Sequence, residues 1–165
     1  MVLGLYGTAD TVGLRTGGGT VTQHELEALG QLLCPTYVLQ GDDINPVIHK
    51  LPDTPFLADY LAASQLPSEK IDLAHFYSGT FSQTIRLLKN RNVPVSYTCP
   101  AHDRKVSVEE FIKLYGSYPY PHIQDDGLWK LFSQGLRDAD LVIAPSKQSA
   151  EFLSVEGCQK VVVIP

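Results

Sequence analysis

The chain has 165 residues, of which 44% are hydrophobic and 19% are charged, a composition typical of one soluble domain with a substantial core. Thirteen basic and eighteen acidic residues give a formal net charge of −5. This balance argues against a nucleic-acid binder, which needs a basic surface to neutralise phosphates. No apolar stretch approaches the roughly 20 residues that cross a bilayer. The first residues also lack the basic start of a signal peptide, so we expect a cytoplasmic protein.

Three cysteines, Cys34, Cys99 and Cys158, lie far apart in the sequence and form no C-x-x-C pair. This spacing predicts neither a zinc knuckle nor a disulfide framework. Reduced thiols in a cytoplasmic protein are the simplest interpretation.

The predicted elements alternate between strand and helix from the start of the chain. An apolar run at residues 2–7 predicts the first strand, and a glycine-rich loop, Gly17–Gly19, precedes the first helix. One face of that helix carries Leu26, Leu29 and Leu33, at the spacing of a packed stripe. Cys34 and Pro35 end the helix, and residues 36–39 form the second strand.

The same alternation continues to the end of the chain. A polar loop at residues 41–54 leads to a helix that Thr54 and Pro55 start and that runs towards Ala63. Later strands are expected at residues 71–76, 93–98, 141–144 and 161–164. Helices are expected around Phe81, Ile85 and Leu88, from the capping box at Ser107 to Tyr115, from Gln124 to Asp138, and from Ser146 to Gly157.

This order predicts the α/β class: a Rossmann-like, three-layer α/β/α sandwich with a mostly parallel sheet of about six or seven strands. The apolar runs at 71–76, 141–144 and 161–164 fit strands that are buried on both faces. Such sheets place ligands beyond the carboxyl ends of their strands. The loops after the first, third, fourth and fifth strands are therefore the candidate site.

Gly17, Gly18 and Gly19 would let backbone N–H groups approach an anion at the N-terminus of a helix. Phosphate and diphosphate are the ligands that this arrangement suits. The sequence contains neither a dinucleotide fingerprint nor a P-loop. A flexible loop followed by Thr20 as a plain N-cap explains the glycines equally well.

The segment from Thr98 to Arg104 follows the fourth strand and so falls at the ligand edge. His102 can donate or accept a hydrogen bond near neutral pH, while Asp103 and Arg104 can fix substrate hydroxyls or orient the histidine. A solvated polar loop is the alternative. A metal site built from Cys99, His102 and Asp103 matches no standard zinc spacing, and we expect none.

Aromatic residues and prolines follow this segment at residues 115–122. The ring of Tyr118 can stack on a sugar face, which makes it a candidate for acceptor recognition. Packing of the loop itself is the alternative interpretation.

Several motifs stand in an order that resembles a known family. They are the glycine loop, Asp72-Leu73-Ala74-His75, the His102–Asp103 pair, the stretch Ala139-Asp140-Leu141-Val142-Ile143-Ala144-Pro145-Ser146, and the ending Val161-Val162-Val163-Ile164-Pro165. Together they look like the N-terminal domain of the group-1 glycosyltransferases, family 4 of the retaining GT-B enzymes. The resemblance covers nearly the whole chain.

The resemblance implies that residues 1–165 are the acceptor-side half of a two-domain enzyme. Its C-terminal, nucleotide-sugar domain is absent from this chain, so we expect the chain to be inactive alone. A sugar would pass from a nucleotide-sugar donor to an acceptor hydroxyl with retention, without a cofactor or metal. The glycines would approach the donor diphosphate and the acceptor, and His102 would contact the donor sugar. Peripheral contact with a membrane also occurs in the family.

Two features depart from the family or stay open. The family often carries an acidic residue soon after its glycines, where this chain has Thr20 to His24; we interpret His24 as a packed or surface residue. His75 matches a common family position at the end of the third strand.

The alternative function is a non-catalytic Rossmann-like module that binds a small ligand or phosphate. A nicotinamide-dependent oxidoreductase is disfavoured, because no acidic residue ends the second strand.

Overall fold

The computed structural model describes residues 2–8, 13, 17–32, 35–40, 59, 62–77, 80–99, 109, 112–117 and 126–164. Within these ranges six strands form one sheet, in the order β2-β1-β3-β4-β5-β6, and every neighbouring pair is parallel. The strands are β1 (Gly4–Thr8), β2 (Thr36–Leu39), β3 (Leu73–Tyr77), β4 (Val95–Thr98), β5 (Leu141–Ala144) and β6 (Val161–Val163). The predicted α/β fold with a parallel sheet is confirmed.

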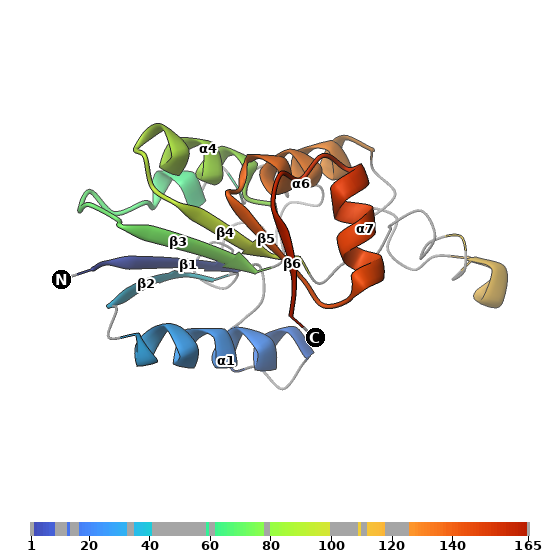
Figure 1. The fold of residues 1–165 in the computed structure, drawn as a ribbon, viewed down its shortest axis with the longest axis horizontal. Helices are drawn as coiled ribbons and strands as arrows, with labels where there is room; N and C mark the ends of the chain where they lie inside the picture. The colour runs from blue at the N-terminus through green and yellow to red at the C-terminus, as the bar shows by residue number, and fades with distance from the viewer. Residues whose placement is uncertain are drawn as a thin grey trace.

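Helices cover the two faces of this sheet unequally. They are α1 (Gly17–Gln31), α4 (Ser82–Asn90), α6 (Asp126–Asp138) and α7 (Lys147–Val155). Figure 1 shows α1 on one face and α4 and α6 on the other. No helix in the described ranges is long and apolar enough to span a membrane. The predicted polar loop at 41–54 lies outside the described residues, as does most of the helix predicted at 54–63. In the helix predicted at 107–115, the described residues 109 and 112–115 are helical.

The core lies between the sheet and α4, α6 and α7. A chain of ring contacts runs through it: Phe76 packs against Phe81 and Tyr97, Tyr97 meets Phe132 edge to face, and Trp129 contacts Phe132 and Phe152. Gly7 is needed at its position, because a Cβ there would lie 2.5 Å from the ring of Phe76. The core thus fixes β1 against β3, the two strands at the centre of the site.

The prediction that the later strands are buried on both faces is wrong for β5 and β6. Val142 and Ala144 are buried, whereas Leu141 and Ile143 are only partly covered, and no residue of β6 is fully buried. The reason is the direction of the chain. From β3 to β6 it moves one way across the sheet, so right-handed crossovers place α4, α6 and α7 on one face. The face that carries Ile143 is covered less.

The strand order has one switch point, between β1 and β3. From β1 the chain goes to β2 on one side, and it later returns to β3 on the other side. Open α/β sheets bind ligands in the crevice at such a point, outside the carboxyl ends of the strands. In this chain those ends are Thr8 and Tyr77. The residues around them form the candidate site.

Candidate functional site

The three glycines lie in α1 itself rather than in a loop before it. The helix begins at Gly17, so Gly17, Gly18 and Gly19 form its first turn, and the predicted loop is corrected accordingly. Thr20 is an exposed residue within the helix and not its N-cap. Because α1 follows β1 in a parallel sheet, this first turn stands at the carboxyl edge of the strands. The backbone N–H groups of a helix start are therefore still presented where a ligand is expected.

Gly13 lies beside this turn. Its backbone N–H donates to the carbonyl of Gly19 over 3.0 Å, and its φ of +74° is a conformation that favours glycine. The hydroxyl of Thr22 donates to the same carbonyl over 2.9 Å. The bond from Gly13 holds the first turn of α1 against the chain that enters it, and the bond from Thr22 lies within the helix.

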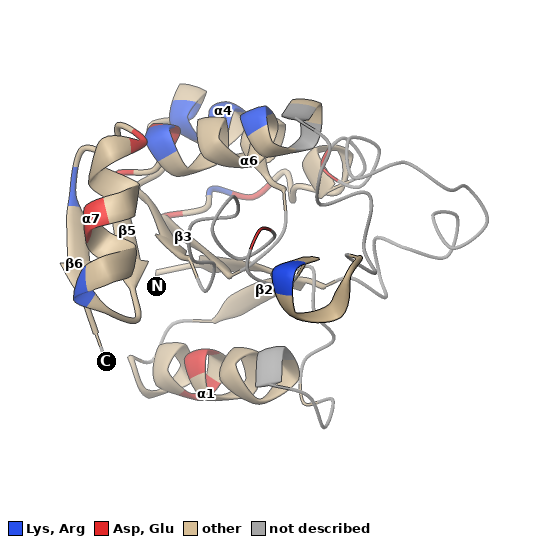
Figure 2. Ribbon diagram, turned by 90° about the vertical axis from the view of Figure 1, so that its right-hand side faces the viewer, with Lys and Arg blue, Asp and Glu red and all other residues tan. Residues whose placement is uncertain are grey.

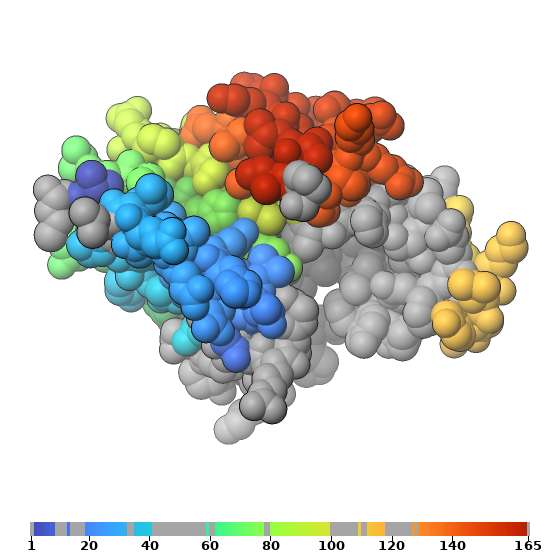
Figure 3. Space-filling model, turned by 60° about the horizontal axis from the view of Figure 1, so that its bottom comes forward, coloured from blue at the N-terminus to red at the C-terminus, as the bar shows by residue number. Residues whose placement is uncertain are grey.

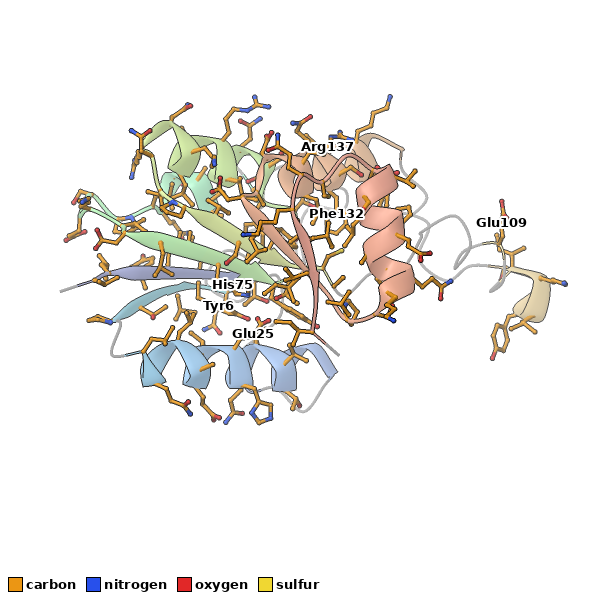
Figure 4. The ribbon with its side chains drawn as sticks, in the orientation of Figure 1. Tyr6, Glu25, His75, Glu109, Phe132 and Arg137 are labelled. Carbon is orange, nitrogen blue, oxygen red and sulfur yellow. The ribbon has the colours of Figure 1, made fainter. Side chains whose placement is uncertain are left out.

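Behind the glycine turn, four elements share one polar network. The hydroxyl of Tyr6 on β1 donates to Glu25 Oε2 on α1 over 2.7 Å. The other carboxylate oxygen of Glu25, Oε1, lies 3.4 Å from His75 Nε2 on β3. His75 Nε2 also lies 3.2 Å from the Thr98 hydroxyl on β4, and His75 Nδ1 lies 2.8 Å from the Ser96 hydroxyl. Figure 4 shows Tyr6, Glu25 and His75 together between α1 and the sheet.

The charge of Glu25 is held in this network. Burial alone would raise the pKa of the Glu25 carboxyl. The hydrogen bond and positive charge of His75, together with hydrogen bonds from Tyr6 and Thr98, outweigh burial and lower that pKa below its ordinary value of 4.5. A carboxylate beside a histidine at a ligand edge is the kind of pair that functional sites contain.

We expect the carboxylate of Glu25 to stabilise the fold in a pH-dependent way. Because its pKa is lower in the folded chain, its contribution is present above pH 4.5 and is lost as the pH falls through the folded pKa. Glu25→Gln should therefore flatten the fall in melting temperature between about pH 5 and pH 3, as measured by circular dichroism. Melting profiles that stay parallel for the two proteins would contradict this assignment.

A groove of about 970 Å³ runs between α1 and the sheet. We call it the α1 groove; its lining residues are Val21, His24, Glu25, Ala28, Leu29, Gln31, Leu32, His75, Tyr77, Thr98, Ile143, Pro145 and Ile164. Figure 3 shows this side of the molecule, where α1 in blue and the C-terminal segment in red flank the sheet. Glu25, His75 and Thr98 of the polar network form part of the groove wall, which is otherwise mostly apolar.

No lysine or arginine is present among the described lining residues, and α1 contains only acidic charges, as Figure 2 shows. Any anion at the first turn of α1 would therefore be held on this helix by backbone N–H groups.

Two other helices that start at this edge have side-chain caps. The carboxylate of Asp59 accepts from the backbone N–H groups of Gln83 and Thr84 at 2.7 and 3.0 Å, and so caps α4. The hydroxyl of Ser146 accepts from the N–H of Ser149 over 3.1 Å and caps α7, as the sequence predicts. In α1 the corresponding turn is built of glycine.

The structure brings together only some of the residues predicted for the site. Thr98 and the glycine turn both lie at the carboxyl edge, and His24 is a surface residue with 71% of its side chain exposed. Cys99 is buried in the hydrophobic core. Four predicted residues lie outside the described ranges: His102, Asp103, Arg104 and Tyr118. No cluster of three or more metal-ligating side chains occurs in the part of the chain that is described.

Sequence reasoning missed Glu25, Tyr6 and Ser96. Glu25 lies one turn after Thr22 and one turn before Leu29, on the side of α1 that faces the sheet. A carboxylate on the buried side of a helix needs a partner, and that signal could have pointed to His75.

The chain was compared with known proteins. The family model described as "Glycosyltransferase Family 4" matches residues 16–165, which includes the glycine turn, all strands after β1 and every helix named above. No curated protein matches the chain. Because the family model spans most of the sequence, and because the observed parallel sheet is consistent with it, the chain belongs to glycosyltransferase family 4.

Proposed function

We propose that this domain is the acceptor-side half of a GT-B enzyme that transfers a sugar from a nucleotide-sugar donor to an acceptor hydroxyl. The donor-binding half would be a second domain outside this chain. The observation that carries the proposal is the family match over residues 16–165. The matched domain carries the glycine turn of α1 at its ligand edge. Membership in the family alone does not name the donor or the acceptor.

The distribution of charge in the α1 groove supports the proposal that a second domain binds the donor diphosphate. A nucleotide diphosphate needs cations as well as backbone N–H groups for tight binding. The described lining of the α1 groove supplies none, so the basic residues that hold the diphosphate would lie in the second domain. Exposed apolar side chains beside the groove, Leu32 at 71% and Ile164 at 59% exposed, support a further contact of this side with another surface.

In the proposed reaction the acceptor oxygen forms a bond to the anomeric carbon of the donor sugar. The bond from that carbon to the phosphate oxygen breaks, the acceptor proton passes to the leaving phosphate, and the nucleoside diphosphate departs. Attack from the face of the leaving group gives retention. The amides of the Gly17–Gly19 turn would face the diphosphate, and His102 would contact the donor sugar beside the reacting carbon. Substrate hydroxyls would meet Asp103 and Arg104, and the acceptor would meet Tyr118. No metal or cofactor takes part.

A donor panel tests the proposal. The full-length protein, with both domains, is incubated with UDP-, GDP- and ADP-sugars, and release of the nucleoside diphosphate is measured. We expect release from at least one donor, and no release when residues 1–165 are used alone. Proton NMR of the product should show the anomeric configuration of the donor. Turnover by the isolated domain at the rate of the full-length protein would contradict the proposal.

A further inference from the structure

His75 joins α1 and β4 through side chains, beside a direct hydrogen bond from Thr98 to Glu25. Its side chain is 10% exposed, and the ring lies against Tyr6 with centroids 5.8 Å apart. One ring atom, Nε2, meets both the carboxylate of Glu25 on α1 and the hydroxyl of Thr98 on β4. The remaining ring nitrogen meets Ser96.

The hydrogen-bond directions follow from the partners. The hydroxyl of Ser96 donates to the carbonyl of Ala74 over 3.4 Å, so Ser96 Oγ can accept from Nδ1–H of His75. In the neutral ring Nε2 then has a lone pair and can accept from the Thr98 hydroxyl alone. In the imidazolium Nε2–H faces two oxygens, Glu25 Oε1 at 3.4 Å and Thr98 Oγ at 3.2 Å, while the Thr98 hydroxyl donates to the Glu25 carboxylate. The imidazolium therefore joins α1 and β4 at this one atom.

The two residues that meet at Nε2 belong to the two candidate site segments. Glu25 stands on the helix whose first turn is Gly17–Gly19, and an α-helix transmits a displacement of one turn to the next because its backbone bonds are continuous. Thr98 is the last residue of β4, the strand from which the chain continues to His102. The separation of these two segments is therefore set by the contacts among Glu25, His75 and Thr98.

We propose that His75 is a positioning residue, whose Nε2 bridges Glu25 and Thr98 and thereby fixes the glycine turn of α1 relative to the carboxyl end of β4. This inference rests on the proposed function, since it is sugar transfer that needs the two segments in register. A displacement of about 1 Å between reacting groups and the groups that hold them costs up to about 100-fold in rate.

Two substitutions separate the bridge from the ring's other contacts. His75→Gln places an amide near the position of Nε2, whereas His75→Asn places one near the position of Nδ1 and leaves the Nε2 position empty. Both remove the ring that contacts Tyr6, so a purely structural role would affect the two variants alike. Ser96→Ala is the matched control, because it removes the partner of Nδ1 and leaves the bridge intact.

Amide hydrogen exchange of the full-length protein, followed by mass spectrometry, measures how firmly the first turns of α1 are held and needs no assay of activity. We expect His75→Asn to raise the exchange rate of peptides from residues 17–24 about tenfold, the effect of losing one hydrogen bond of about 1.4 kcal/mol. His75→Gln and Ser96→Ala should stay within about threefold of the wild type. Thr98→Val should raise exchange in the same α1 peptides, although it lies on β4, because it removes both the contact to Nε2 and the hydrogen bond to Glu25.

Steady-state kinetics with the active donor are the second test of the positioning role of His75. We expect His75→Asn to lower kcat about tenfold while the KM for the donor changes less than about twofold, because positioning is lost rather than binding. His75→Gln should restore most of kcat. Equal exchange and equal kcat in the asparagine and glutamine variants would overturn the inference. If the wild-type protein transfers no sugar from any donor, the proposed function fails, and the exchange measurements still decide whether Nε2 couples α1 to β4.

Discussion

Replacing Asp59 with alanine is expected to lower the free energy of unfolding by about 3 kcal/mol. The side chain is 1% exposed and accepts from two backbone N–H groups at the start of α4 and from the hydroxyls of Ser82 and Thr84. In α4 the residue at the N-cap position, Phe81, makes no side-chain cap. Loss of the carboxylate would leave several buried donors without an acceptor. Each such donor destabilises the fold by the full free energy of its desolvation.

Urea unfolding followed by circular dichroism measures this effect. Asp59→Asn keeps one acceptor oxygen and should cost less than the alanine variant. Gln83→Ala is the control, because Gln83 is exposed on the same turn of α4 and its backbone N–H still reaches Asp59; its midpoint should stay close to that of the wild type. Equal midpoints for Asp59→Ala and the wild type would show that the start of α4 does not depend on Asp59.

The second large effect is expected in catalysis. In the full-length protein His102→Ala should lower kcat at least about 100-fold, because a group that contacts the transition state is removed. The proposal places His102 beside the anomeric carbon of the donor, and the chain reaches it directly after β4. Initial rates of nucleoside diphosphate release with the active donor measure the loss, and the melting temperature shows whether the variant is folded.

The sequence predicts those elements whose ends are marked locally. The strands at 36–39 and 141–144 have the predicted bounds, because Pro35 precedes one and Pro145 follows the other. Ser146 caps α7, and Gly157, with φ of +91°, follows its end. These signals act over a few residues, and no distant contact competes with them.

The first turn of α1 could not be predicted from helix propensities. Glycine has a low helix propensity, so three glycines in a row favour a loop over a helix. In the fold they form the first turn, and two of the bonds that hold that turn come from Gly13 and Thr22. Both contacts come from residues close by in the chain, and the one from Gly13 accompanies a φ of +74°, which helix propensities do not indicate.

The polar network depends on residues that are far apart in the sequence. Glu25 and His75 meet only because β1 and β3 pair in parallel at the switch point, and Asp59 caps a helix 24 residues later in the chain. The sequence shows a histidine at the end of the third strand and a glutamate in the first helix, but it contains no pattern that pairs them. The parallel sheet was predictable from the alternation of elements, whereas the register that aligns these side chains was not.

The central claim is that the carboxyl edge of this sheet is half of a sugar-transfer site. Its most direct test compares two residues in one full-length enzyme: His102, which would touch the donor sugar, and Arg86, which is exposed on α4, on the face of the sheet opposite α1. Measured as the initial rate of diphosphate release from the active donor, the rate should fall at least about 100-fold for His102→Ala and stay within about twofold for Arg86→Ala. A His102→Ala enzyme as fast as the wild type, or two variants impaired to the same extent, would contradict the account.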